Sequence, residues 1–395
     1  MSMSKDGFEG WLARCVERWP VEARSMLGPA LSSPESALSE QSEGSWARGA
    51  FPGMDGDWRE FDRAALSLRC LWELSESGSL DRLGARADPA WARLLSGVEG
   101  QSGGLDALAY ATLFNDLGKL GSTTAALAAA GRPEPADHDE AMLQAALWTP
   151  EKVCPGLSGL GAPWAELWRE GMAAGFNAGM AMQMEAPRAG WARWLALGSG
   201  ARAFHALHSY LDVLGAQGAM DPRAPGAIMG SRGFSSRFHA ACFAGSAQGF
   251  EKGAAAELGM EGVGRPVLAA AMCARSDGPR SARVCAEALA GSSAQTREGL
   301  DWLWGEQSRM ALQYAPALLA VDVSEPGLAR GLEALGRAAQ SLRRLANAGH
   351  AGLHGDEVGV GNIAAMASAR ARGDAGWNAP GRWQTREGGW LWSME

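Results

Sequence analysis

The chain has few cysteines for its length, and none are placed to act together. Six of the 395 residues are cysteines, and no two form a C-x-x-C pair. Scattered cysteines of this kind favour reduced core residues over a disulfide framework or a zinc knuckle. They are typical of a protein that stays in the cytoplasm.

Long apolar runs are also missing. Residues 1–7 are polar and no apolar segment follows them, which argues against a secretory signal. The longest weakly charged stretch, residues 171–184, is too short and too rich in glycine to span a bilayer. We therefore expect a cytoplasmic protein without a membrane partner.

Basic residues are outnumbered. The 36 lysines and arginines face 44 acidic residues, which gives a net charge of −8, and lysine occurs only at positions 5, 119, 152 and 252. Nucleic-acid binding normally needs a basic face that displaces counterions from phosphates. The composition therefore argues against a nucleic-acid partner.

Alternating β-branched residues, which mark strands, are scarce, whereas apolar residues at helical spacing are frequent. The pattern predicts an all-α protein with helices over residues 1–27, 58–76, 105–117 and 137–147. We divide the chain into an N-terminal helix and linker (1–57), a helical domain (58–375) and a tail (376–395). The tail carries four tryptophans, is not helical in pattern, and is expected to be irregular and to fold back over an apolar groove.

The first polar pattern is the run Asn-Asp-Leu-Gly-Lys at residues 115–119. A helix that ends at Leu117 would place Gly118 in the left-handed position that follows many helices. Asp116 would then face the negative end of the helix dipole, at a cost of about 0.3–1 kcal/mol. A bound cation would offset this cost, so Asp116 is a candidate ligand.

Two further patterns lie downstream. Asp137 and Glu140 have the spacing of a capping box at the start of a helix, and His138 between them is either a first-turn residue or a metal ligand. His205, His208 and Asp212 lie at i, i+3 and i+7, and so share one stripe of a helix. Imidazole and carboxylate groups on one stripe can hold a cation, although buried histidines can also be core residues.

These residues resemble a known family. Residues 115–119 are similar to the HDxGK signature of the HD-domain superfamily, whose members are all-helical and mostly metal-dependent. The resemblance covers roughly residues 105–214 and implies an HD-like helical bundle with a divalent iron, manganese or zinc ion. The ligands that it implies are Asp116, His138, His205, His208 and Asp212.

The chain departs from that family at two points. Asn115 stands where the signature has a histidine, and no histidine precedes His138. Glu73 is a candidate substitute for the missing ligand. The resemblance therefore implies a reduced centre, with one metal ion or none.

Two functions follow from the resemblance. The first is a phosphoester hydrolase or iron oxygenase that acts on a small-molecule substrate. In the hydrolase, Lys119 would stabilise negative charge on the substrate, and His138 or His208 would move the proton. The alternative is a non-catalytic HD-like binding or regulatory module, in which the same side chains are caps and buried hydrogen-bonding groups. Both leave the oligomeric state open.

Overall fold

A computed structural model shows a predominantly helical protein, and the all-α class expected from the sequence is confirmed. One small sheet accompanies the helices. The structure describes residues 7–27, 58–80, 83, 89–135, 138–184, 189–218, 234–276, 278–304, 310–313, 315–320, 322–348, 359–363, 366–367, 370, 374, 381–386 and 389–394.

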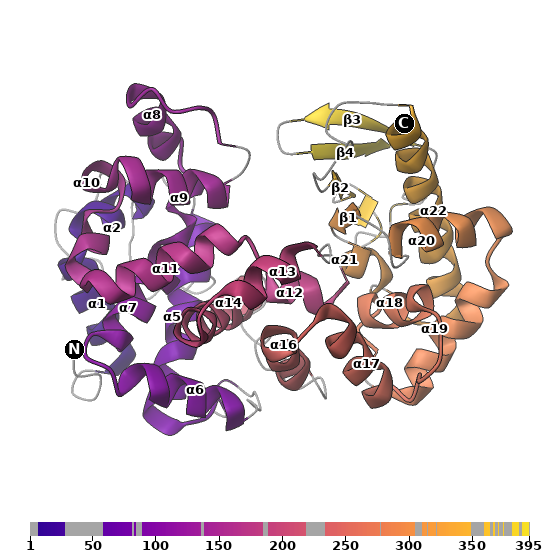
Figure 1. Cartoon of the computed structure of the whole chain (residues 1–395), viewed down its shortest axis with the longest axis horizontal. Coiled ribbons are helices and arrows are strands. Elements are labelled where there is room, and N and C mark those ends of the chain that lie inside the picture. The colour runs from indigo at the N-terminus through magenta and orange to yellow at the C-terminus, as the bar shows by residue number, and fades with distance from the viewer. Residues whose placement is uncertain are drawn as a thin grey trace. The chain divides into compact units, whose positions relative to one another are not determined.

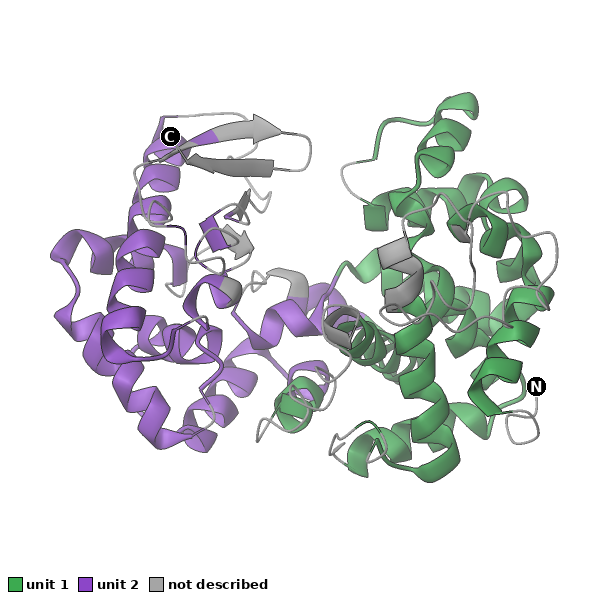
Figure 2. Cartoon of the chain, turned by 180° about the vertical axis from the view of Figure 1, so that it is seen from behind, with its two compact units in different colours: residues 1–175, 197–239 green, residues 176–196, 240–395 purple. Residues whose placement is uncertain are grey.

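The chain forms two compact units, shown in different colours in Figure 2. Unit 1 comprises residues 1–175 and 197–239, and unit 2 comprises residues 176–196 and 240–395. Both units are therefore discontinuous in sequence. This division differs from the single helical domain over residues 58–375 that the sequence suggested.

Every described secondary-structure element of unit 1 is a helix (Figure 1). Its elements are α1 (Gly7–Arg18), α2 (Pro20–Leu27), α5 (Trp58–Ser77), α6 (Pro89–Glu99), α7 (Gly104–Phe114), the 3₁₀ helix η2 (Asn115–Lys119), α8 (Gly121–Ala129), α9 (His138–Trp148), α10 (Pro150–Val153), the 3₁₀ helix η3 (Pro155–Leu160), α11 (Ala162–Ala174), α14 (Ser199–Gly218) and the start of α16 (Phe234–Phe243).

Aromatic side chains fill the core of unit 1. The rings of Trp91 and Tyr210 are stacked, with centroids 3.9 Å apart and planes inclined by 1°. The Trp91 indole donates to the carbonyl of Ser235 at 3.1 Å, and the Tyr210 hydroxyl lies 3.0 Å from the Ser235 hydroxyl. These contacts link α6, α14 and α16 around a buried aromatic core.

The N-terminal helix expected over residues 1–27 is wrong in one respect. It consists of two helices, α1 and α2, which are separated at Trp19. Pro20 is the first residue of α2, a position where its missing N–H has no helical partner to lose. The helix expected over residues 58–76 is confirmed as α5.

Unit 2 contains nine described helices and a sheet. Its elements are α12 (Ala178–Met182), α13 (Ala189–Ala196), the end of α16, α17 (Ala247–Glu257), α18 (Arg265–Cys273), α19 (Pro279–Gly291), α20 (Ala294–Trp304), β1 (Met310–Gln313), α21 (Ala315–Leu319), α22 (Glu325–Asn347), β2 (Gly359–Asn362), β3 (Gly381–Arg386) and β4 (Gly389–Met394).

Among the described helices of unit 2, α20 and α22 pack over the most extensive contact. A β-carbon on Gly299 would lie 2.5 Å from the carbonyl oxygen of Gly336, and one on Gly336 would lie 2.7 Å from the Thr296 methyl group. The two helices can approach this closely only because neither glycine carries a side chain. At the start of α20, Thr296 donates a hydrogen bond to Glu333 of α22 at 2.5 Å.

The C-terminal tail is not irregular, as the sequence suggested, but forms a β-hairpin. Strands β3 and β4 pair in antiparallel fashion, and β4 also pairs in parallel with β2. The complete sheet has the order β1-β2-β4-β3. Trp383 is buried and its indole donates to the carbonyl of Ala338 in α22 at 3.0 Å, so this tryptophan does pack back onto the helical part of unit 2.

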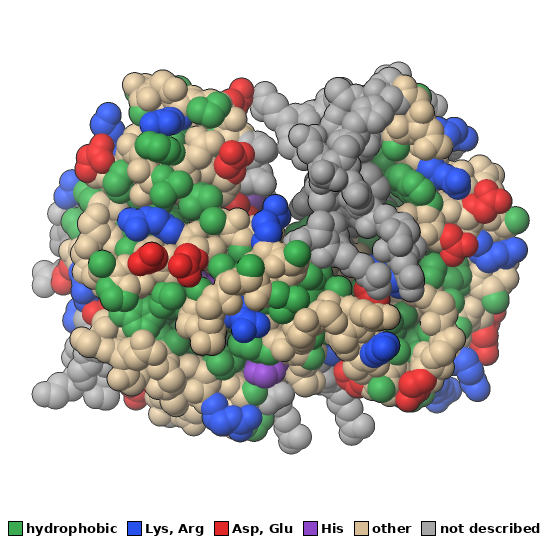
Figure 3. All heavy atoms as spheres, in the orientation of Figure 1, with side chains coloured by type: hydrophobic (Ala, Val, Ile, Leu, Met, Phe, Trp, Pro, Cys, Tyr) green, Lys and Arg blue, Asp and Glu red, His purple; other side chains and the backbone are tan. Residues whose placement is uncertain are grey.

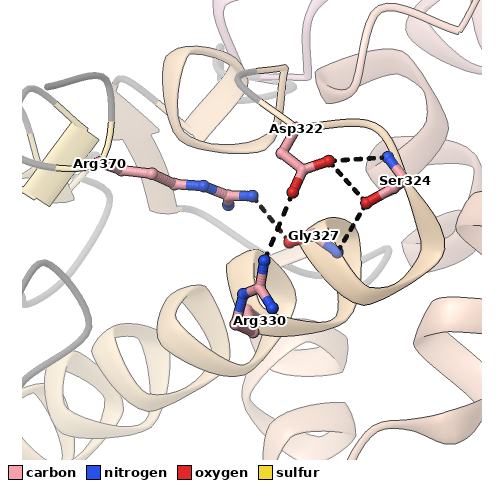
Figure 4. Close-up of polar contacts among 5 residues, drawn as sticks. All are labelled: Asp322, Ser324, Gly327, Arg330 and Arg370. Atoms are coloured by element: carbon pink, nitrogen blue, oxygen red, sulfur yellow. Dashed lines mark hydrogen bonds and ion pairs between the residues drawn. The ribbon is translucent and has the colours of Figure 1, made fainter. Parts of the chain in front are cut away.

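A polar cluster joins the C-terminal segment to the start of α22 (Figure 4). Asp322 accepts hydrogen bonds from the hydroxyl and the backbone N–H of Ser324, which hold the pKa of Asp322 below its usual value. Ser324 in turn caps the helix by accepting from the N–H of Gly327. The buried guanidinium of Arg370 donates to the carbonyl of Gly327 at 2.7 Å, and Arg330 lies 3.4 Å from Asp322.

Candidate functional site

The turn that resembles the HDxGK signature is a 3₁₀ helix, η2, that continues from α7. Asp116 is buried, and its carboxylate accepts a hydrogen bond from the Lys119 ammonium at 2.9 Å. The hydroxyl of Thr123 donates to the Leu117 carbonyl at 2.7 Å. The carboxylate of Asp116 is therefore paired with a lysine of the same turn, and the Thr123 hydrogen bond links the turn to α8.

Gly118 has a different role from the one expected. It is not among the described glycines with a positive φ, so it is not a left-handed residue after a helix. A β-carbon at Gly118 would instead overlap the backbone carbonyl of His138 at the start of α9. The glycine is needed because η2 and α9 meet backbone to backbone.

His138 is close to this turn through its backbone but not buried beside Asp116. Its side chain is 44% exposed, and its Nε2 lies 3.5 Å from a carboxylate oxygen of Asp139. Asp137, the expected cap of α9, lies outside the described residues. The structure thus joins the two segments while leaving the imidazole at the surface.

The histidine pair on α14, which the sequence placed on one stripe of a helix, is buried. His205 and His208 are 8% and 4% exposed, and their ring centroids are 5.7 Å apart. Gly171 of α11 leaves room for the first ring, since a β-carbon there would lie 2.7 Å from Nδ1 of His205. Asp212, one turn further along α14, is half-buried.

His208 has an unusual environment. Neither of its ring nitrogens has a hydrogen-bond partner. Burial lowers the pKa of His208 from 6.5 to about 4, and no charged side chain contributes to this shift. The imidazole is therefore neutral at pH 7.

The five proposed ligands do not fit a single metal centre. Within the described part of the chain, no three His, Cys, Asp or Glu side chains are placed to hold a metal ion. A divalent ion between His205 and His208 would be buried beside neutral donors, at a high cost unless a carboxylate compensates its charge. Asp116 is already paired with Lys119, so the ligand set stays a prediction that the geometry does not favour.

Two features of unit 1 were not identified from the sequence. The first is Glu22 of α2, which is 1% exposed and accepts hydrogen bonds from the Tyr110 hydroxyl at 3.0 Å and the Gly156 N–H at 2.6 Å. Nothing in the local pattern marks Glu22, because its partners lie 88 and 134 residues away. The second is an exposed tryptophan at the end of α9, whose neighbour Leu147 could have drawn attention to it.

Comparisons with protein-family models, curated proteins and solved structures found no match for this chain. No described helix is both long and apolar enough to cross a membrane.

Proposed function

We propose that this chain is a non-catalytic helical module that acts by binding a partner, and that its HD-like residues serve the fold. The observation that carries the proposal is the turn at residues 115–119. Its aspartate is paired with its own lysine, and its glycine lies against the backbone of α9. Each residue of the signature that is retained has a structural task.

The pairing of Asp116 with Lys119 is the central point. Their side chains are 7% and 24% exposed, so water screens the pair only in part. Removing one partner would leave the other charge poorly solvated, at a cost of about 1–3 kcal/mol. A ligand in this place would have to compete with the ammonium group for the carboxylate.

A double-mutant cycle with metal analysis tests this function. Asp116→Asn and Lys119→Met should each lower the free energy of unfolding, and the double variant should lose less than the sum of the two. A coupling energy of about 1 kcal/mol is expected for a pair of this exposure. Metal content, measured by elemental analysis on protein purified without chelator, should be the same in wild type and variants. A near-stoichiometric metal that disappears in Asp116→Asn would contradict the proposal.

A second candidate, the metal-dependent phosphoester hydrolase or iron oxygenase, is favoured by one observation. His208 presents two buried ring nitrogens without hydrogen-bond partners beside His205, and a neutral imidazole is the form that ligates metals. A divalent ion held there would lower the pKa of a bound water and polarise a substrate oxygen. Asp212 is the carboxylate on the same helix stripe.

The same measurement separates the two candidates. If the second holds, iron, manganese or zinc should be present and should be lost from a His205→Ala, His208→Ala double variant. His138→Ala, which removes an exposed imidazole, is the control. It distinguishes metal loss caused by removing the buried pair from metal loss caused by removing any histidine. Metal retained by the double variant would contradict the second candidate.

A further inference from the structure

The end of α9 exposes two large apolar side chains in succession. Leu147 and Trp148 are 51% and 52% exposed. The other exposed large apolar residues of the described chain are three valines, each isolated in the sequence. A single exposed apolar residue needs no explanation, but an adjacent leucine and tryptophan do.

The tryptophan is held in place by a cation. The guanidinium carbon of Arg132 lies 3.5 Å from the centroid of the Trp148 ring. This contact fixes the orientation of the ring before any partner arrives, which reduces the entropy cost of binding. Tryptophan and arginine are also the residues that most often dominate interface energies.

Exposed carboxylates flank this apolar pair in the sequence. Glu140 lies two turns before Trp148 on α9, and Glu151 lies on α10, which begins after the helix break at Thr149. Glu134 follows Arg132 by two residues and is also exposed. Figure 3 shows apolar side chains at the surface over α8 and α9 with acidic side chains beside them.

The charge of the whole unit has the same sign. The sequence of unit 1 contains 27 acidic and 19 basic residues, whereas unit 2 contains 17 of each. The entire net charge of −8 therefore belongs to unit 1. An apolar pair flanked by exposed carboxylates on an acidic unit is complementary to a basic partner that has an apolar face.

We propose that Leu147, Trp148 and Arg132, with the exposed carboxylates that flank them in the sequence, form the docking surface for a basic amphipathic helix of a partner protein. The apolar face of that helix would cover Leu147 and Trp148, and its lysines or arginines would meet Glu134, Glu140 and Glu151. This assignment rests on the proposed function as a binding module, and it names the kind of partner.

The test uses the full-length chain and a synthetic probe. A fluorescein-labelled helical peptide with leucines on one face and lysines on the other is titrated against the protein, and binding is followed by fluorescence anisotropy. Trp148→Ala should weaken binding by roughly tenfold or more, as expected for a central aromatic anchor. The matched control is Val323→Ala in unit 2, which removes an apolar side chain of the same 52% exposure and should leave the affinity unchanged.

Charge is tested separately. Glu140→Gln with Glu151→Gln should weaken binding and reduce its dependence on salt, because exposed charge pairs are screened by ions. A probe with glutamates in place of the lysines should not bind. Equal affinity of wild type and Trp148→Ala for the lysine probe, or binding of the glutamate probe, would overturn the proposal.

Analytical ultracentrifugation of the same protein samples tests whether a second copy of the chain occupies this surface instead. A dimer that forms with rising concentration in wild type, and is lost in Trp148→Ala, would place a second copy of the chain on this surface and overturn the basic partner. Metal analysis remains independent of these results. If the peptide does not bind and no metal is found, only the docking surface is contradicted. If a stoichiometric metal is found in wild type and is lost in Asp116→Asn, the proposed function as a binding module is contradicted.

Discussion

At the scale of single residues, the sequence identified Gly118 as structurally important but gave the wrong physical reason for it. The sequence suggested a left-handed residue after a helix, but the structure uses the missing side chain for the contact with the His138 carbonyl. Gly118→Ala should therefore lower the free energy of unfolding by about 1–3 kcal/mol, because backbone cannot move aside as a flexible side chain can. Urea denaturation followed by circular dichroism measures the change.

A second glycine in the same unit provides the control. Gly121 starts α8, and a β-carbon there would meet nothing within 4 Å. Gly121→Ala should leave stability unchanged or raise it slightly, since alanine loses less conformational entropy in a helix. Equal destabilisation by the two substitutions would contradict the backbone contact at Gly118.

His208 supplies a prediction about pH. Its pKa is about 4 in the folded protein and 6.5 in an unfolded reference. As the pH falls from 6.5 to 4, the unfolded chain takes up a proton before the folded one, so this group makes the protein progressively less stable across that window. The full effect is at most about 3 kcal/mol.

Replacing the imidazole should remove this contribution. Urea midpoints of wild type should fall between pH 6.5 and pH 4.5 more steeply than those of His208→Leu. His138→Leu, which changes an exposed side chain, serves as the control and should keep the wild-type slope. A His208→Leu profile parallel to that of wild type would show that the buried imidazole does not titrate in this way.

The sequence predicted that the two histidines share one helix stripe, but it did not predict their surroundings. Helical spacing places His205 and His208 on one stripe beside apolar residues, and both are buried. Whether their nitrogens find partners depends on α11 and other helices that contribute no local signal. The ion pair between Asp116 and Lys119 was not predicted either, because the sequence alone does not show which basic side chain a given carboxylate contacts.

At the scale of elements, the helices with strong apolar periodicity were predicted well. α5 and α9 match their expected ranges within one or two residues, and α7 ends three residues early because the chain tightens into η2. The hairpin β3–β4 was missed because its strands contain glycines and tryptophans rather than alternating β-branched residues. The pairing of β4 with β2 adds a non-local contact that periodicity cannot reveal.

The crossing of α20 and α22 gives a prediction at this scale. Gly299→Ala places a methyl group 2.5 Å from the Gly336 carbonyl oxygen, so the helices must separate or the backbone must shift. A loss of about 1–3 kcal/mol in the free energy of unfolding is expected. Gly253→Ala in α17 has open space and should stabilise by about 0.4–1 kcal/mol. Denaturant titrations that place Gly299→Ala at or above wild type would contradict the close crossing.

At the scale of the whole molecule, the sequence failed to predict the division into two units. The chain leaves unit 1 after residue 175, returns at residue 197, and leaves again after residue 239. Such boundaries follow from contacts between distant segments, such as Trp91 with Ser235, and not from linkers. The linker that the sequence suggested at residues 28–57 lies outside the described residues.

Two units that each bury their own core should give separable unfolding transitions. In differential scanning calorimetry, Gly118→Ala should lower one transition and Gly299→Ala the other. For units of about 200 residues, each kcal/mol lost corresponds to about 2–4 °C. The chain passes between the units three times, which is the feature that would couple their unfolding. If both variants shift one shared transition equally, the prediction is contradicted and the units are parts of a single cooperative fold.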